Sequence, residues 1–394
     1  MKTDRKASYA LYSTDSKNQK STRGLALLLS LILVLSTAAF WPAGQAEAAG
    51  TTIDATKLKS ISRLYFPMRD EKKQLYTLYL FATDEKKTLT TQEGAWAGAN
   101  VGDVVYSGTY RAALLKHGQK TGSVQNINLN FDFFNATRNE SFRLPGDGKN
   151  RPDLLFLSEA ASSNVNLIRG FAITGGTLHS LSIADGNGKV WGKETAAAQK
   201  NAMRGLSGDR IQTRVYDNSS GRYRFDIYKL DLKQLKLRHI DDLYAPSNAW
   251  PTGQGSHALL DSIKQSALKH VLRDKPQVKI GMTEKQVRSI MGSPKTVENG
   301  EWGGYFGYGN LWVGFNDYMN QGKIPAHARV GELTTQLNGT FMRTHQVKEW
   351  LGAPKEEYED DLEGGYAMIY RWNNASLVFR YEYDGGPIHS FSIH

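Results

Sequence analysis

The segment 280–315 carries the signals that most restrict how this chain can fold. Thr283 and Gln286 have the spacing of a capping box, in which the Thr hydroxyl accepts from a first-turn amide and the Gln side chain reaches back. Gly292 can close the helix, and the proline two residues later prevents its continuation. The aromatic, Gly-punctuated stretch 304–315 is typical of a hairpin. The sequence therefore predicts a helix, a turn and a hairpin. The apolar stripe of this helix consists of Val287, Ile290 and Met291.

The same pattern returns about sixty residues later, which identifies an internal repeat. Six residues recur within fourteen positions: Met282, Gln286, Val287, Gly292, Pro294 and Lys295 match Met342, Gln346, Val347, Gly352, Pro354 and Lys355. Gly364-Gly365-Tyr366 matches Gly303-Gly304-Tyr305, Leu377-Val378-Phe379 matches Leu311-Trp312-Val313, and Arg343 replaces the Thr cap. We expect helices over 284–291 and 345–351 on the same side of one sheet. Val330 to Gln336 and Ile388 to Ile393 are the expected closing strands.

The motif GMTEKQVRSIMGSP resembles that of the small lipoprotein subunit of the outer-membrane β-barrel assembly machine. Its two tandem copies resemble the β-lactamase inhibitory protein, an arrangement shared by a Bacillus-type family of uncharacterised secreted proteins. The resemblance covers residues 256–394 and implies an α+β domain, with helices packed on an antiparallel sheet. Its two halves would be 256–337 and 338–394. Members of this superfamily are binding modules with unrelated partners, so the resemblance implies binding without naming the partner.

The N-terminus has the features of a secretory leader spanning residues 1–48. A basic stretch precedes the apolar run 25–41, and Ala46-Glu47-Ala48 fits a cleavage site. The apolar run of 17 residues is also near the lower limit for a membrane span, so a retained anchor is the alternative. The absence of cysteine favours export of the Gram-positive type, without disulfides. We expect a secreted or cell-surface protein.

The region 51–244 predicts an all-β domain, either a sandwich or an open barrel-like sheet of about seven to nine strands. The expected strands are Gln74–Phe81, Val104–Leu115, Val124–Phe134, Asp153–Leu157, Asn166–Ile173, Thr177–Ile183 and Tyr223–Leu230. A short helix is expected over Ala196–Met203. The Pro-, Gly- and Ser-containing segment 245–255 is the expected linker. A helix beginning near Ser256, capped by its hydroxyl and carrying apolar residues as far as Leu272, should open the α+β domain.

Catalytic and metal-binding patterns occur only as fragments. Ser266-Ala267-Leu268-Lys269 and Lys120-Thr121-Gly122 match elements of penicillin-recognising enzymes, but in reversed order and in different predicted domains. The histidines have no metal-binding spacing. The loop 146–155 is weakly similar to the calcium loop of integrin-type surface repeats, although residues 143–145 offer no carboxylates. We therefore predict no catalytic residue, metal or cofactor, and a plain turn at this loop.

Seven aromatic residues on the two predicted hairpins are the candidate binding site: Trp302, Tyr305, Tyr308 and Trp312 in the first half, and Tyr366, Tyr370 and Trp372 in the second. Exposed aromatic rings commonly anchor protein interfaces, and packing beneath the helices is the alternative. The acidic residues 356–363 predict a solvated loop. The basic residues within 222–238 predict either a surface for anionic polymers or an edge strand protected by charge.

The leading hypothesis is an exported, non-enzymatic protein that binds another macromolecule through the aromatic sheet face of residues 256–394. The partner would be an extracellular or envelope protein, not a nucleic acid. The alternative is an envelope-associated module held electrostatically to anionic wall polymers, because the formal charge is +10 and remains positive without residues 1–48. A hydrolase with an unrecognised site is the third possibility. Salt should weaken electrostatic attachment much more than aromatic contacts.

Overall fold

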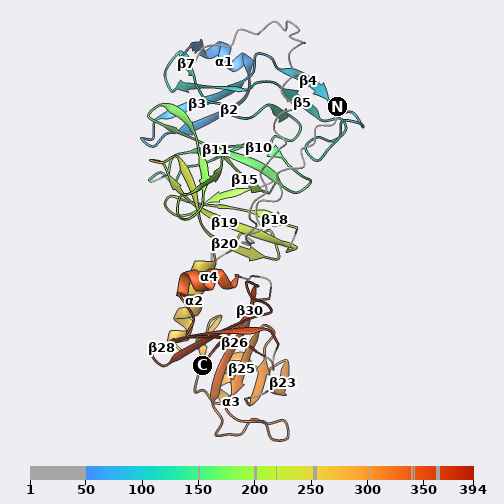
Figure 1. Ribbon diagram of the computed structural model, residues 1–394, viewed down its shortest axis with the longest axis vertical. Helices are drawn as coiled ribbons and strands as arrows, with labels where there is room; N and C mark the ends of the chain where they lie inside the picture. Colours follow the sequence, from blue (N-terminus) through green and yellow to red (C-terminus); the bar gives the residue numbers. More distant parts are fainter. Residues whose placement is uncertain are drawn as a thin grey trace, which may run out of the picture. The chain divides into compact units, whose positions relative to one another are not determined.

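The computed structural model describes residues 50–149, 151–198, 202–218, 220–251, 255–300, 302–338, 340, 342–360 and 364–394. The expected leader 1–48, with its apolar run, lies outside these residues, as do residues 252–254 of the expected linker and 361–363 of the acidic stretch. The described part is mostly β, with four helices and several sheets (Figure 1). No helix within it is both long and apolar enough to cross a membrane.

The described residues between 52 and 245 contain twenty strands in four sheets, rather than one sandwich or barrel of seven to nine strands. The first sheet, beside helix α1 (Ala55–Ile61), contains β1 (Thr52–Asp54), β7 (Thr121–Val124), β6 (Arg111–Lys116), β3 (Leu75–Phe81) and β2 (Ser62–Arg69). The second contains β4 (Lys86–Leu89), β5 (Val104–Ser107) and β8 (Phe133–Asn135). The third contains β12 (Thr177–Ser180), β11 (Asn166–Thr174), β10 (Leu154–Ala160), β9 (Phe142–Leu144) and β15 (Glu194–Ala197). The fourth contains β14 (Val190–Gly192), β13 (Ser182–Ala184), β20 (Lys236–Ala245), β19 (Arg222–Asp231), β17 (Arg210–Thr213), β16 (Met203–Gly205) and β18 (Val215–Asp217).

Several predicted elements in this region are shorter than expected. The predicted strand Val104–Leu115 divides into β5 and β6, and Thr177–Ile183 divides between two sheets. Of Val124–Phe134, only the first residue, in β7, and the last two, in β8, belong to strands. The prediction of a helix over 196–203 is wrong for the residues of this range that the structure describes, because β15 ends at Ala197 and β16 begins at Met203. The strands predicted at 74–81, 153–157, 166–173 and 223–230 correspond to β3, β10, β11 and β19.

The part of 256–394 that the structure describes contains three helices, a small hairpin and one large sheet. The helices are α2 (Ser256–Leu268), α3 (Glu284–Met291) and α4 (Thr344–Leu351), and the hairpin is β21 (Val271–Leu272) with β22 (Lys275–Lys279). The large sheet has the order β23 (Thr296–Asn299), β24 (Gly304–Gly307), β25 (Leu311–Phe315), β26 (Val330–Gln336), β30 (Ile388–Ile393), β29 (Ala375–Tyr381), β28 (Tyr366–Trp372) and β27 (Glu356–Glu359). Helix α2 is shorter than predicted, since Val271 and Leu272 form β21.

The two halves of the eight-stranded sheet are built alike, with β26 and β30 paired at its centre (Figure 1). The Tyr308 hydroxyl donates to the Gly292 carbonyl in the first half, and Tyr370 donates to Gly352 in the second. Likewise, the Val330 amide donates to Met282, as Ile388 does to Met342. Side chains from all three helices enter one core with the inward residues of the sheet.

The two ends of helices α3 and α4 form as the repeated motif predicts. In α3, the Gln286 amide donates to the Thr283 hydroxyl, and the Gln286 side chain accepts from the Thr283 amide, as a capping box requires. In α4 the Gln346 side chain accepts from the amide of the N-cap residue, Arg343. The side chain of Arg343 itself makes no capping hydrogen bond. Both helices end at a glycine with positive φ, 78° at Gly292 and 84° at Gly352.

Replacing Gly292 with alanine is expected to lower the free energy of unfolding by about 1–2 kcal/mol. Its φ of 78° and ψ of −156° are strained for any residue with a Cβ, although the added atom would meet nothing within 4 Å. Chemical denaturation of the full chain measures this change. Ser289→Ala is the control on the same helix, and an equal loss in both variants would contradict the assignment of strain to Gly292.

Candidate functional site

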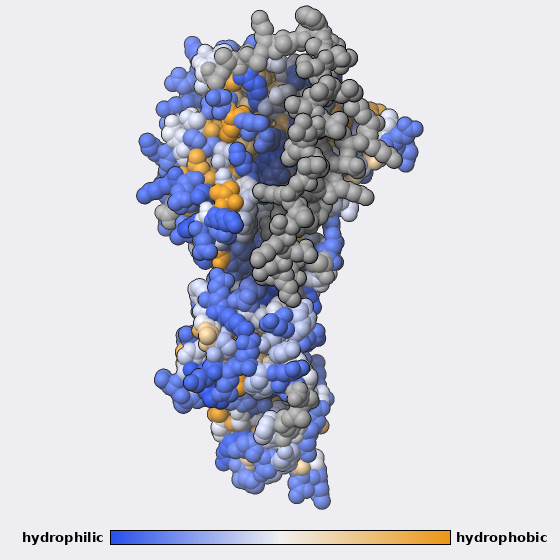
Figure 2. Space-filling view, in the orientation of Figure 1, coloured by the Kyte–Doolittle hydropathy of each residue, from blue (hydrophilic) through white to orange (hydrophobic). Residues whose placement is uncertain are grey.

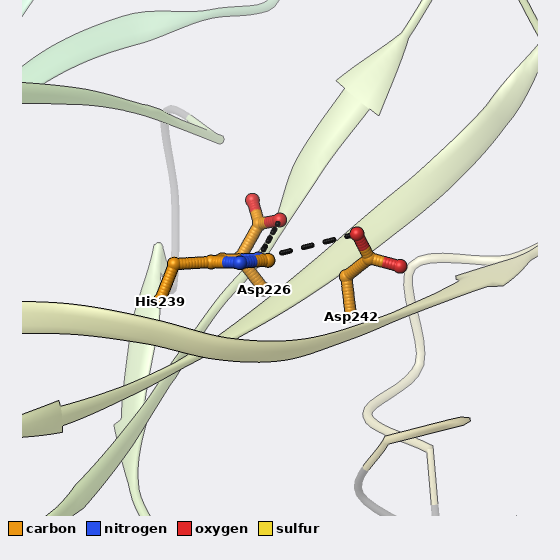
Figure 3. Close-up of side chains that lie close together, drawn as sticks. All are labelled: Asp226, His239 and Asp242. Atoms are coloured by element: carbon orange, nitrogen blue, oxygen red, sulfur yellow. Dashed lines mark hydrogen bonds and ion pairs between the residues drawn. The ribbon is translucent and has the colours of Figure 1, made fainter. Parts of the chain in front are cut away.

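Three titratable side chains lie together on the β19–β20 hairpin (Figure 3). The Nε2 atom of His239 lies 3.2 Å from Oδ1 of Asp226 and 3.9 Å from Oδ2 of Asp242. Asp226 is only 2% exposed. This buried charged cluster is the main concentration of perturbed ionisable groups that we find in the described residues.

An irregularity in strand pairing brings these side chains together. Asp226 lies opposite Asp242, and Tyr228 lies opposite His239, with a register shift between them. On a regular strand, positions three apart point to opposite faces of the sheet, but a β-bulge changes this alternation. The shift therefore accounts for His239 and Asp242 meeting on one face.

Arg224 determines the charge state of the cluster. Its Nε lies 3.0 Å from Asp226, and this ion pair, with the His239 contact, lowers the pKa of Asp226 to about 2 although burial acts in the opposite direction. Burial acts to lower the pKa of His239, but the hydrogen bond to Asp226 and the attraction of the Asp226 and Asp242 carboxylates together outweigh burial and raise that pKa. Burial and the facing Asp226 carboxylate together raise the pKa of Asp242 to about 6. The cluster thus holds the positive charge of Arg224 and the negative charge of Asp226 together where water solvates them poorly.

The same three residues offer the donor atoms of a metal site, since one ligand atom of each lies within 4.8 Å of the others. However, Arg224 already neutralises Asp226. The Gln346 side-chain amide also donates to the carboxylate of Asp242. These contacts satisfy the carboxylates from within the protein, so the cluster fits a structural role better than a cation site.

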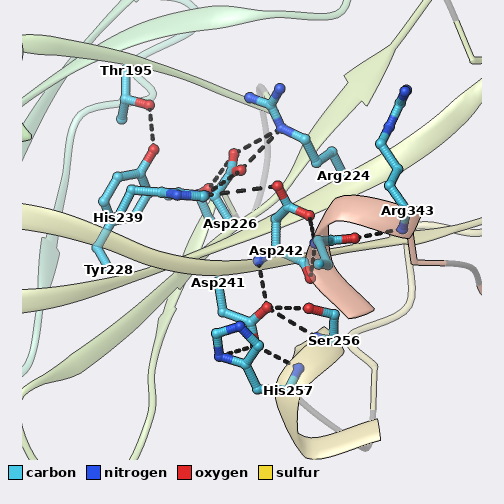
Figure 4. Close-up of polar contacts among 12 residues, drawn as sticks. Thr195, Arg224, Asp226, Tyr228, His239, Asp241, Asp242, Ser256, His257 and Arg343 are labelled. Carbon is cyan, nitrogen blue, oxygen red and sulfur yellow. Dashed lines mark hydrogen bonds and ion pairs between the residues drawn. The ribbon is translucent and has the colours of Figure 1, made fainter. Parts of the chain in front are cut away.

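Adjacent residues of β20 hold the N-termini of two helices (Figure 4). Asp241 accepts hydrogen bonds from the amides of Ser256 and His257 in the first turn of α2, at 3.2 and 3.1 Å. Asp242 accepts from the side chain of Gln346 in the first turn of α4, whereas Asp241 accepts from backbone amides. Carboxylates are favoured at these positions because the first amides of a helix lack partners and carry partial positive charge. The cluster therefore connects the β19–β20 hairpin to α2 and α4.

Ser256, His257 and Asp241 bring a hydroxyl, an imidazole and a carboxylate together, but not as a catalytic triad. The Ser256 hydroxyl donates directly to Asp241 and is fully buried. The His257 ring stacks on Trp350, with centroids 4.1 Å apart, and its Nδ1 lies 3.7 Å from Asp241, so the carboxylate lies between Ser256 and His257. A serine nucleophile needs the imidazole between itself and the carboxylate. Ser256 is also not the N-cap predicted from the sequence, because Gly255 occupies that position.

The seven predicted aromatic residues do not form one surface. Tyr370 is 3% exposed, and it packs in the helix-covered core together with the half-buried Tyr308, Tyr366 and Trp372. Tyr305 and Trp312 point to the opposite face, because they alternate with the core residues Phe306 and Val313 along β24 and β25. Trp302 is 70% exposed and precedes β24. The expectation of a shared aromatic patch is therefore wrong for the four rings on the helix-covered side.

The sheet face that points away from α2, α3 and α4, here called the open face, carries a continuous row of paired side chains. Strand pairing places Trp312 opposite Thr334, Thr334 opposite Ser392, and Ser392 opposite Val378. Tyr305 donates to Glu332 at 2.8 Å, and Thr334 donates to the other oxygen of Glu332 at 2.6 Å. The open face thus combines two partly exposed aromatic rings with a polar centre held by hydrogen bonds.

The two predicted charged segments are also placed differently from expectation. The acidic residues Glu356 to Glu359 are exposed as expected, but they form the edge strand β27 rather than a loop, and Glu356 pairs with Arg371 and Glu357 with Lys348. Strand β19 lies inside its sheet rather than at an edge, and Arg224 is engaged with Asp226. The basic stretch therefore does not form a single free basic face.

Comparison with known proteins does not assign the chain to a family. No family model matches the chain, and no curated protein matches it.

In one view of the surface, hydrophobic residues occur in small groups separated by hydrophilic ones (Figure 2).

Proposed function

We propose that this chain is an exported, non-enzymatic binding protein that recognises another protein through the open face of its eight-stranded sheet. We also propose that residues 256–394 have the tandem-repeat fold of the β-lactamase inhibitory protein, with 51–244 as a separate β-rich domain joined through 245–255. The matching hydrogen bonds from Tyr308 to Gly292 and from Tyr370 to Gly352 support the repeat.

The observation that carries the binding proposal is the row of side chains on the open face. Trp312 and Tyr305 are half-buried, so their rings are already fixed and lose little conformational freedom on binding. The hydrogen bonds of Glu332 and Thr334 present polar groups in fixed positions beside them. Aromatic residues surrounded by oriented polar groups are the usual composition of a protein interface.

Affinity capture tests this function. The immobilised full chain is incubated with the extracellular fraction of its source, and retained proteins are compared between wild type and variants. Trp312→Ala, alone and combined with Trp302→Ala, should reduce retention of a specific protein at least tenfold, and moderate salt should not release it.

The matched control is Tyr383→Ala, because Tyr383 is an exposed aromatic residue in the β29–β30 turn outside the open face. Retention should be unchanged in this variant. If the retained material survives all the aromatic changes and is released by salt, electrostatic attachment to the envelope replaces the present proposal.

A further inference from the structure

A cavity of about 260 Å³ lies between the β2–β3 turn and the loop that precedes β10. Five basic residues line it: Arg69, Lys73, Arg143, Lys149 and Arg151. The loop is the one whose sequence is weakly similar to calcium loops. Its chemistry in the structure is different, because these five cations outnumber the three carboxylates that also line the cavity, Asp70, Glu71 and Asp153.

Two of the three lining carboxylates hold the cavity walls together, and the third, Glu71, accepts from the Gly175 amide at 3.1 Å. Asp153 accepts from the amides of Gly146 and Arg69, at 2.7 and 2.9 Å, and from the Arg143 side chain at 3.0 Å. These bonds fasten the loop to the end of β2 and occupy both carboxylate oxygens. Asp70 similarly accepts from two amides of the β2–β3 turn. These groups are therefore poor ligands for a cation.

Most of the cations, in contrast, make no direct ion pair among the described residues, although Asp147 and Asp153 attract Arg151. Within the described residues, neither Arg69, Lys73, Lys149 nor Arg151 forms an ion pair. Arg151 is the most constrained of them, being only 7% exposed. Its Nε and Nη1 atoms are buried without a hydrogen-bond acceptor. A buried guanidinium without an acceptor for these two atoms is energetically unfavourable.

Gly205 of β16 supports this position of Arg151. A Cβ at Gly205 would lie 2.1 Å from Nη2 of Arg151, so the glycine leaves the space that the guanidinium occupies. Burial also lowers the pKa of Arg151 from its ordinary value, although arginine remains protonated at neutral pH. The loop and β16 thus hold a charged group beside the cavity.

We propose that this cavity binds a phosphate group. Arg and Lys donors suit the several acceptor oxygens of phosphate, and guanidinium groups recognise it through paired hydrogen bonds. The volume is below the ~300–1,000 Å³ of sites for drug-sized ligands, which favours one small anionic group. The phosphate could be free or belong to a phosphodiester polymer, and the test below separates these sources. The site is independent of the open face.

Isothermal titration of the full chain with inorganic phosphate, and separately with a glycerol phosphate oligomer, tests the proposal. Wild type should bind phosphate saturably, and Lys73→Gln combined with Lys149→Gln should weaken binding at least tenfold. Both lysines are exposed, so the thermal unfolding midpoint should remain unchanged. Tighter binding of the oligomer would identify a phosphodiester polymer as the source, and equal or weaker binding would identify free phosphate.

Lys72→Gln combined with Lys87→Gln is the matched control. It removes the same charge, and Lys72 lies in the same turn as Lys73 without lining the cavity. Binding should stay within twofold of wild type. No saturable phosphate binding by wild type, or equal weakening in both double variants, would overturn the proposal, since the second result indicates diffuse attraction instead of a site.

Discussion

Replacing Asp226 with alanine is expected to lower the free energy of unfolding by about 3–5 kcal/mol, the range seen when one partner of a buried ion pair is removed. The change would leave the Arg224 guanidinium partly buried beside His239 without the carboxylate that both contact. Chemical denaturation of the full chain, followed by circular dichroism, measures the loss.

Asp209→Ala is the control for this prediction, because it removes an ion pair in the same sheet that is exposed. Asp209 lies 3.8 Å from Lys229, and both side chains are more than a third exposed. Such pairs contribute about 0–1 kcal/mol. A similar small loss in Asp226→Ala would mean that Arg224 finds another partner or becomes solvated, and that the cluster does not stabilise the hairpin.

Replacing Asp242 with asparagine should have the opposite effect and stabilise the protein at pH 8, by up to about 3 kcal/mol. Asp242 has a folded-state pKa of about 6, above the ordinary value of an aspartic acid, because it is buried opposite Asp226. Asparagine keeps an oxygen that can accept from Gln346 and removes the charge.

The pH dependence identifies the cause. An acid whose pKa is raised by folding destabilises the folded state only when it is deprotonated, so Asp242 lowers the free energy of unfolding progressively as pH rises from about 4 to about 6. The gain from Asp242→Asn should therefore be small at pH 4 and complete above about pH 7. A gain that is equal at pH 4 and pH 8 would show that charge is not responsible.

The repeat and its helices could be predicted because their signals are local. Helix α3 begins after Thr283 and ends before Gly292, as the capping box and the glycine indicate.

The faces of the hairpins could not be predicted, because the loop before β28 is longer than the loop before β24. Lys295 donates to Gly307, whereas Lys355 donates to Ile369, so Tyr305 and Tyr366 do not occupy equivalent positions. A shift of one residue moves a side chain to the other face.

The charged cluster could not be found from sequence spacing. Arg224 and Asp226 stand two positions apart in a strand-like segment, which is a local hint of an ion pair on one face. Its other members depend on the pairing of β19 with β20 and on the register shift between Ile227 and Tyr228. Both are properties of the folded sheet that no periodicity in the sequence reports.

Site-specific photocrosslinking tests the proposed binding function most directly. A benzophenone amino acid replaces Trp312 on the open face or, as the control, Tyr383 in the β29–β30 turn, and each full chain is irradiated with the extracellular fraction of its source. The proposal predicts a discrete crosslinked protein from position 312 that is absent from position 383. No crosslink at position 312, or the same products from both positions, would contradict binding through the open face.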